Sequence, residues 1–200
     1  MARAYLYWFE KCLQDSLPDP KITVPWWDWT SNESRIEGIP QAFADDTVNG
    51  LPNPLYTFYV ELPDWVDLEA FILQTGCQKS RSYYTHREPE NSFQLPTLDE
   101  IDYLLNLTDY GDFSDGLEEI YNRIHRWVGG RCGDMSYVSF AAYDPIFWSH
   151  HCMIDRIFWL WQLRDRRSLP LCLYDQVLDP FNLTVRDVLD VYQLDYDYAS

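Results

Sequence analysis

The stretch Asp144-Pro-Ile-Phe-Trp-Ser-His-His-Cys-Met-Ile-Asp155 places two adjacent histidines inside a dense aromatic segment. Asp144-Pro145 is a strong helix-start signal, because an aspartate accepts backbone N–H groups at the N-cap and a proline fits the first turn. We therefore predict a helix that begins here and runs to about Arg164. The chain has four histidines, and this helix carries half of them.

Three roles are open to the histidine pair: metal ligands, an acid/base pair, or buried structural imidazoles. His151 and Asp155 are four residues apart on one helix face, where a carboxylate can orient an imidazole directly or through neighbours. Acid/base work by both His150 and His151 is disfavoured, since adjacent helical residues point in different directions. On residue type alone, a hydrogen-bonded structural histidine is the commoner case, and a metal ligand is the alternative.

A second predicted helix ends at Gly129-Gly130 and carries Tyr121 and His125 on one face. Its apolar stripe is regular and consists of Phe113, Leu117, Ile120 and Ile124. If His125 faces His151 from the neighbouring helix, the pair forms the kind of metal site that helical bundles build in their cores. Imidazole suits copper, zinc or iron, so the ligand type alone leaves the metal open.

The rest of the chain predicts further helices joined by long irregular connections. Apolar spacing or capping residues indicate helices over 3–15, 64–75 and 97–106, and a last short one opened by Thr184 and Asp187. We predict that residues 24–30 form a rigid aromatic segment that is not helical. Residues 31–62 contain several Gly and Pro and are predicted to form an irregular surface loop. The fold class predicted is mainly α, as one domain.

Composition narrows the function classes. A 200-residue chain that is 46% apolar and 17% aromatic can build a real core. Its net charge of −17 argues against nucleic acid as a partner, and it has no apolar run long enough for a membrane helix. No signal peptide is visible, whereas three Asn-x-Ser/Thr sequons, at Asn32, Asn106 and Asn182, mildly favour a secreted protein. Five cysteines cannot all pair with one another.

Four blocks, in order, resemble the tyrosinase and molluscan haemocyanin family. The stretch 144–155 looks like its second copper-site signature. The other blocks resemble three further parts of the family's core domain. These are the segment after the first copper site, the helix with the first two ligands of the second copper, and the tyrosine-rich end of the domain. They are Arg3-Ala-Tyr-Leu with Phe9-Glu10 and Val24-Pro-Trp-Trp-Asp-Trp-Thr30, then Tyr121-Asn-Arg-Ile-His-Arg-Trp-Val-Gly-Gly130, then Leu194-Asp-Tyr-Asp-Tyr198.

The resemblance implies an antiparallel helix bundle, the type-3 copper core, that holds two copper ions. Each ion is bound by three histidines, and the two ions bind O2 between them. Tyrosinases of this family hydroxylate monophenols and oxidise diphenols, catechol oxidases perform only the second reaction, and haemocyanins carry O2. The partners implied are phenolic small molecules and O2, and the location implied is extracellular.

Site residues are carried over position by position. His125 and His151 match the second and third ligands of the second copper, and His150 matches a neighbour that is not a ligand. Phe147 matches the aromatic residue packed beneath the copper pair, and Asn122 matches a polar residue beside the first ligand position.

The departures from the family pattern bear on chemistry. Tyr121 occupies the first ligand position of the second copper, and Ala2 occupies the last ligand position of the first copper. The other two positions fall before Met1, so two of six positions carry histidine. A phenolate ligand at Tyr121 is a minor alternative to a packing role, because its pKa is ordinarily near 10. His86 lies in a loop and reads as a surface histidine.

We therefore expect a single tyrosinase copper-binding domain over residues 1–200, truncated at its N-terminus, with one copper or none. The expected function is an impaired tyrosinase-type oxidoreductase. The alternatives are a haemocyanin-like O2-binding module and a degenerate non-catalytic domain. Without the family's N-terminal helix, the apolar faces of residues 3–15, 113–125 and 146–162 leave a groove that a partner or a missing segment has to cover.

Overall fold

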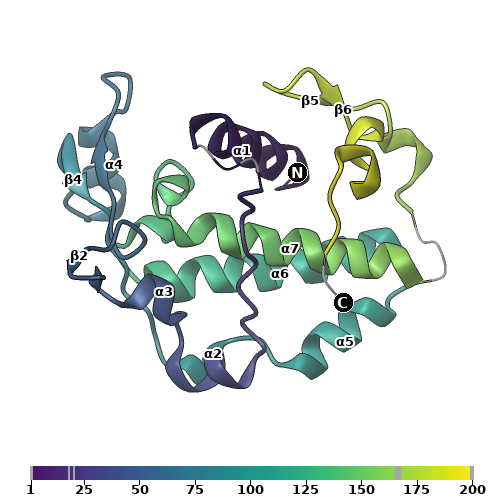
Figure 1. Cartoon of the computed structure of the whole chain (residues 1–200), viewed down its shortest axis with the longest axis horizontal. Helices are drawn as coiled ribbons and strands as arrows, with labels where there is room; N and C mark the ends of the chain where they lie inside the picture. The colour runs from purple at the N-terminus through teal and green to yellow at the C-terminus, as the bar shows by residue number, and fades with distance from the viewer. Residues whose placement is uncertain (1, 18, 20, 165–167, 199–200) are drawn as a thin grey trace. The chain divides into compact units, whose positions relative to one another are not determined.

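The computed structural model describes residues 2–17, 19, 21–164 and 168–198. The secondary structure of this part is mainly α-helical. The longer helices are α1 (Ala2–Ser16), α4 (Leu68–Thr75), α5 (Leu98–Asn106), α6 (Tyr110–Gly129) and α7 (Ile146–Leu163) (Figure 1). The shorter elements are α2 (Asn32–Glu37) and α3 (Gln41–Ala44), and the antiparallel strand pairs β1 (Thr47–Val48) with β2 (Leu51–Pro52), β3 (Tyr59–Glu61) with β4 (Ser82–Tyr84), and β5 (Val177–Leu178) with β6 (Leu183–Thr184).

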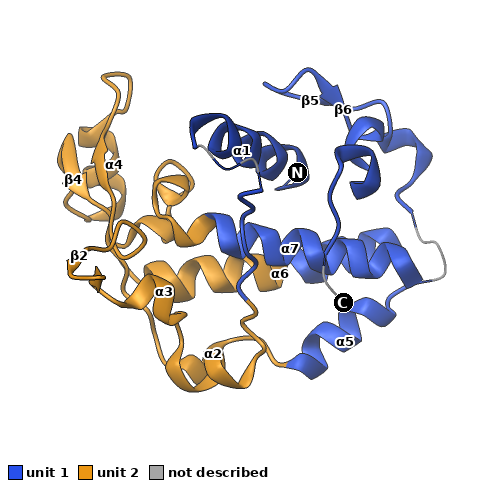
Figure 2. Ribbon diagram, in the orientation of Figure 1, with its two compact units in different colours: residues 1–27, 98–118, 148–200 blue, residues 28–97, 119–147 orange. Residues whose placement is uncertain are grey.

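The chain divides into two compact units (Figure 2). Unit 1 comprises residues 1–27, 98–118 and 148–200, and unit 2 comprises residues 28–97 and 119–147. Each unit therefore contains a stretch of α6 and a stretch of α7. None of the described helices combines the length and hydropathy that crossing a membrane requires.

The core of unit 1 is built on stacked aromatic rings. The rings of Phe113 on α6 and Trp161 on α7 are stacked with centroids 4.6 Å apart, and both side chains are buried. The indole N–H of Trp161 donates to the carbonyl oxygen of Leu107 at 2.7 Å, which gives this buried polar group its partner. The predicted stripe thus faces a core, since Leu117 of the same helix is also buried.

A buried carboxylate joins distant segments of unit 1. Nε of Arg3 donates to Oδ1 of Asp155 at 2.8 Å, and the two side chains are 4% and 2% exposed. The hydroxyls of Tyr196 and Tyr198 each donate to Oδ2 at 2.7 Å. Burial, with Asp155 beside them, raises the pKa of both tyrosines. Asp155 therefore anchors α1 and the tyrosine-rich segment to α7.

The core of unit 2 gathers around Phe140, which packs with Val60, Leu62 and Val66. The ring of Phe71 on α4 meets Phe140 edge-on at 4.8 Å between centroids. These side chains fix the β3–β4 pair and α4 in one layer of apolar contacts.

Most predicted helices are confirmed, and two predictions are wrong: the loop over residues 31–62 and the start of α4. Residues 31–62 contain α2, α3 and the short strands β1 to β3, because local side-chain hydrogen bonds order them. Ser31 caps α2 by accepting from the N–H of Ser34, and the Asn53 amide donates to the carbonyls of Ala42 and Asp45.

The other wrong prediction is the start of α4. That helix begins at Leu68 and not at residue 64, because the side chain of Asp67 accepts from the N–H of Ala70 and so sets the N-cap there. Its predicted end is confirmed by Gly76, which adopts a left-handed C-cap conformation with φ of 73°. The last short helix is a 3-10 turn over Arg186–Val188.

Candidate metal centre

The helix that carries the histidine pair starts where the sequence predicts. Oδ1 of Asp144 accepts from the backbone N–H of Ile146, the first residue of α7, at 3.2 Å. Asp144 is fully buried, and Nε of Arg87 donates to both of its carboxylate oxygens at 2.8 and 2.9 Å. This charge-assisted contact fixes the first turn of α7, from which the histidines follow.

His150 and His151 are both buried on the second turn of α7, at 0% and 8% exposure. Their ring centroids are 5.3 Å apart and the rings are nearly perpendicular, at 83°. This is the divergence expected of consecutive helical residues.

His125, on α6, has a defined tautomer. Its Nδ1 lies 2.7 Å from the carbonyl oxygen of Met135. A carbonyl oxygen only accepts, so Nδ1 carries the proton and donates, and Nε2 of the neutral ring keeps its lone pair. Burial lowers the pKa of His125, with the Met135 contact opposing it to a smaller degree. The neutral form, which binds metals, is therefore favoured.

Two aromatic side chains surround the His125 ring. The half-buried Tyr121, one turn earlier on α6, has its ring centroid 4.4 Å from that of His125. The buried Phe147, on the first turn of α7, lies edge-on at 6.0 Å. Phe147 thus packs beside a predicted ligand and occupies the position one helical turn before His151.

His125, His150 and His151 form what we call the three-histidine group. Each offers one ring nitrogen, and these nitrogens lie within 4.8 Å of one another. Imidazole nitrogens are donors that suit copper or zinc. Within the described residues the three-histidine group is the one group of three or more such side chains.

The remaining predicted site positions lie in other surroundings. His86 is 58% exposed and its Nε2 lies 3.1 Å from Oε1 of Glu88, which agrees with a surface histidine. Asn122 is half-buried on α6. Ala2 lies on the first turn of α1 and lines a mainly apolar cavity of about 140 Å³ together with Phe113 and Phe158.

The resemblance gives His150 as a neighbour that is not a ligand, and a ring nitrogen of His150 is also one of those in the three-histidine group. Sequence reasoning missed one feature of the centre, the contact between the Met135 carbonyl and His125. The Met135 carbonyl was missed because a backbone oxygen leaves no mark on residue type. One sequence signal could have indicated this contact. The segment between His125 and Met135 contains Gly129-Gly130 and Gly133, and these glycines allow the chain to turn back toward α6.

A helical fold with a buried three-histidine group defines a candidate metal-binding protein. The family model described as the common central domain of tyrosinase matches residues 3–164. Over 162 residues the chain is 33% identical to the haemocyanin A-type, units Ode to Odg, of Enteroctopus dofleini, which covers 80% of this chain and 12% of that protein. It is 26% identical over 178 residues to a tyrosinase of Streptomyces lincolnensis, covering 82% and 62%.

Solved structures give the same fold. The tyrosinase of Burkholderia thailandensis superposes with a TM-score of 0.77 at 22% identity, covering 100% of this chain and 60% of that one. A functional unit of octopus haemocyanin superposes with a TM-score of 0.73 at 26% identity, covering 100% and 50%. The chain belongs to the tyrosinase and haemocyanin family of type-3 copper proteins. It spans about an eighth or less of the first haemocyanins it matches.

Proposed function

We propose that this chain binds one copper ion through His125 and His151, with His150 as the third ligand. The observation that carries the proposal is the three-histidine group, whose ring nitrogens lie within 4.8 Å of one another. Its support is the match of residues 3–164 to the central domain of tyrosinase, a copper-binding family.

The protein's contribution to the site follows from its own contacts. The Met135 carbonyl holds the proton of His125 on Nδ1, so Nε2 would be the nitrogen by which His125 binds a metal ion. Burial of His150 and His151 keeps water from competing for the same nitrogens. A copper ion held there would supply the redox chemistry of the site.

We propose that oxidation of phenols is impaired in this chain. Tyr121 and Ala2 occupy family ligand positions without histidine, so the described residues supply ligands for one ion and not for a coupled pair. The substrate class proposed for the family activity is phenolic, since a tyrosinase of Aspergillus oryzae has been solved with L-tyrosine. We therefore expect little oxidation of catechol when the protein is supplied with catechol and O2.

Reversible O2 binding is the second candidate function. It is favoured by identities of 33% and 32% to octopus haemocyanins. O2-dependent changes in absorption that reverse under vacuum, without catechol turnover, would support this function over the first. We also propose an extracellular location, supported by the disulfide between Cys77 and Cys132, because such bonds persist in oxidising compartments.

The test is copper stoichiometry and electron paramagnetic resonance after loading with Cu(II) and dialysis. One copper per chain with an intense spectrum is expected, because a lone Cu(II) ion has an unpaired electron whereas a coupled pair is silent. His125→Ala and His151→Ala should lose the ion, and His86→Ala, at a surface histidine, should retain it. Two coppers per chain with a silent spectrum, or equal binding by His125→Ala and the parent, would overturn the proposal.

A further inference from the structure

We propose that Asp134 is a positioning residue, which holds the Met135 carbonyl against His125 and so sets the strength and geometry of metal binding at that ligand. The inference rests on the proposed copper site and adds to it a residue that touches neither the ligand nor the metal. It concerns residues that all belong to unit 2.

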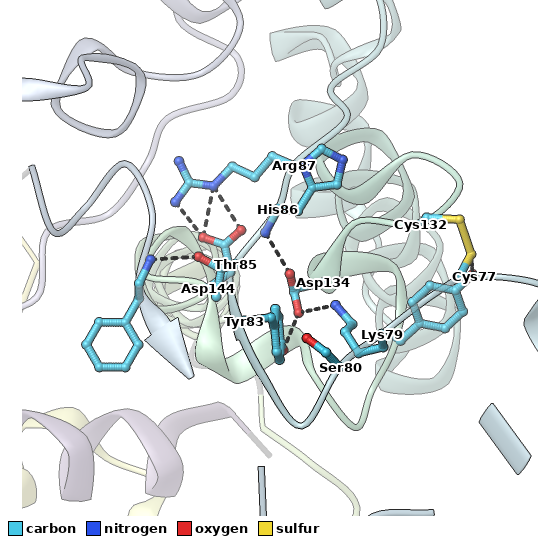
Figure 3. A network of polar contacts seen from close by, with 12 residues as sticks. Cys77, Lys79, Ser80, Tyr83, Thr85, His86, Arg87, Cys132, Asp134 and Asp144 are labelled. Atoms are coloured by element: carbon cyan, nitrogen blue, oxygen red, sulfur yellow. Dashed lines mark hydrogen bonds and ion pairs between the residues drawn. A yellow bond between two sulfur atoms is a disulfide. The ribbon is translucent and has the colours of Figure 1, made fainter. Parts of the chain in front are cut away.

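Asp134 is fully buried and its carboxylate has three donors (Figure 3). Oδ1 accepts from Nζ of Lys79 at 2.7 Å and from the hydroxyl of Tyr83 at 2.6 Å. Oδ2 accepts from the backbone N–H of His86 at 2.7 Å. A buried carboxylate with three donors is satisfied and held in one orientation.

The backbone of Asp134 is fixed on both sides as well. Its N–H donates to the carbonyl of His86 at 2.9 Å, and its carbonyl accepts from the N–H of Tyr137 at 3.0 Å. Met135 follows directly in the chain. The orientation of its carbonyl is therefore restricted by the planar peptide bonds on its two sides, Asp134–Met135 and Met135–Ser136. That carbonyl is the group 2.7 Å from Nδ1 of His125.

The segment that supplies the donors is itself fastened to the same turn. We call residues 77–88 the strap. Cys77 at one end of the strap is disulfide-bonded to Cys132, two residues before Asp134. At its other end Oε2 of Glu88 accepts from the N–H groups of Arg131 and Cys132, at 2.9 and 3.0 Å. Lys79, Tyr83 and His86 therefore reach Asp134 from a segment tied down at both ends.

The consequence is a chain of contacts from the strap through Asp134 and Met135 to His125. Partners that orient a metal-binding histidine typically alter metal affinity 10- to 100-fold when they are lost. Removing the charge of Asp134 leaves Lys79 buried without its counter-ion and releases the strap, so the Met135 carbonyl loses its fixed position.

The experiment compares Asp134→Asn and Tyr83→Phe with Asn53→Ala as a matched control. Asn53 is a buried polar residue of the same unit whose amide holds α3 and the following loop, and whose hydrogen bonds involve neither Asp134 nor its three donors. The first readout is the 15N and ring N–H signal of His125 in the metal-free protein. The second is the Cu(II) dissociation constant, and the third is the Cu(II) hyperfine splitting.

In Asp134→Asn the His125 ring N–H signal should broaden or shift, the Cu(II) dissociation constant should rise about 10- to 100-fold, and the hyperfine splitting should change. Tyr83→Phe removes one donor and should move all three readouts in the same direction by less. Asn53→Ala should lower the melting temperature and leave the three readouts as in the parent.

Folded variants at Asp134 or Tyr83 with an unchanged His125 signal would overturn the inference, and so would equal changes in Asn53→Ala. If Asp134→Asn fails to fold, the three readouts of Tyr83→Phe test the inference instead. Failure of the proposed function is recognised separately, because His125→Ala would then bind copper as the parent does. In that case the metal-free ring N–H signal still tests whether Asp134 positions His125.

Discussion

Nε of Arg3 lies 2.8 Å from Oδ1 of Asp155, although 152 positions of sequence separate the two residues. The guanidinium also donates to the carbonyl oxygens of Val188 and Leu189. One buried ion pair thus connects α1, α7 and the segment after β6 within unit 1.

Loss of Arg3 should destabilise the protein strongly. Arg3→Met leaves the Asp155 carboxylate buried without its cation, and breaking such a pair typically costs about 3–5 kcal/mol. The measurement is urea unfolding followed by tryptophan fluorescence. Arg186→Met is the control, because its ion pair with Asp175 is exposed and should contribute no measurable stability. Equal midpoints for the two variants would contradict the assignment of Asp155 as an anchor.

Gly129 and Gly111 should respond in opposite ways to alanine, although both lie in α6. A Cβ at Gly129 would lie 2.3 Å from the backbone nitrogen of Ser136, which cannot move aside cheaply. A Cβ at Gly111 would lie 3.0 Å from Oδ1 of Asp109, which is the end of an exposed side chain and not backbone. Gly129→Ala should therefore lower the free energy of unfolding by about 1–3 kcal/mol. Gly111→Ala should be neutral or raise it by up to about 1 kcal/mol through helix propensity.

Reduction of the disulfide should weaken the fold. For the 55-residue separation of Cys77 and Cys132, the chain-entropy account gives about 4 kcal/mol of stabilisation. The double variant Cys77→Ser with Cys132→Ser should lower the melting temperature, and dithiothreitol should lower that of the parent but not of the variant. Cys12→Ser, at an exposed free cysteine, serves as the control and should melt like the parent. An unchanged melting temperature of the parent protein in dithiothreitol would contradict the expectation.

Glu88 should contribute to acid sensitivity. The N–H of Cys132, and then the His86 side chain, lower the pKa of Glu88 below its usual 4.5. A carboxyl with a depressed folded-state pKa stabilises the fold above its unfolded-state pKa, and this stabilisation is lost as the pH falls through the folded-state value. Between pH 5 and 3, Glu88→Gln should thus lose less stability than the parent. Glu61→Gln, at an exposed strand residue, should follow the parent curve.

Local signals explain which parts of the fold were predictable. The start of α7 depends on Asp144 and Pro145, and the stripe of α6 on a regular apolar spacing, so residues within a few positions of one another carried the information. The segment 31–62 was misjudged because its order comes from isolated contacts such as that of Asn53 with Ala42 and Asp45. No periodic pattern encodes contacts of that kind.

The predicted ligand residues of the candidate site could be found from the sequence, whereas the residues that position them could not. His125 and His151 stand in quoted motifs, whereas Asp134 is one of many acidic residues and only the return of the strap gives it Lys79 and Tyr83. The pairing of Cys77 with Cys132 has the same cause, since it depends on tertiary proximity across 55 residues.

The anchoring of Asp155 has a consequence for biosynthesis. The carboxylate lies one turn after His151 on α7, and its donors come from residue 3 and from residues 196 and 198. While the chain is still emerging from the ribosome, the two tyrosine donors have not been made, and the helix lacks contacts that fix it. Final packing of the histidine helix must then follow synthesis of residues 196 and 198, so any metal would be inserted after that segment has left the ribosome.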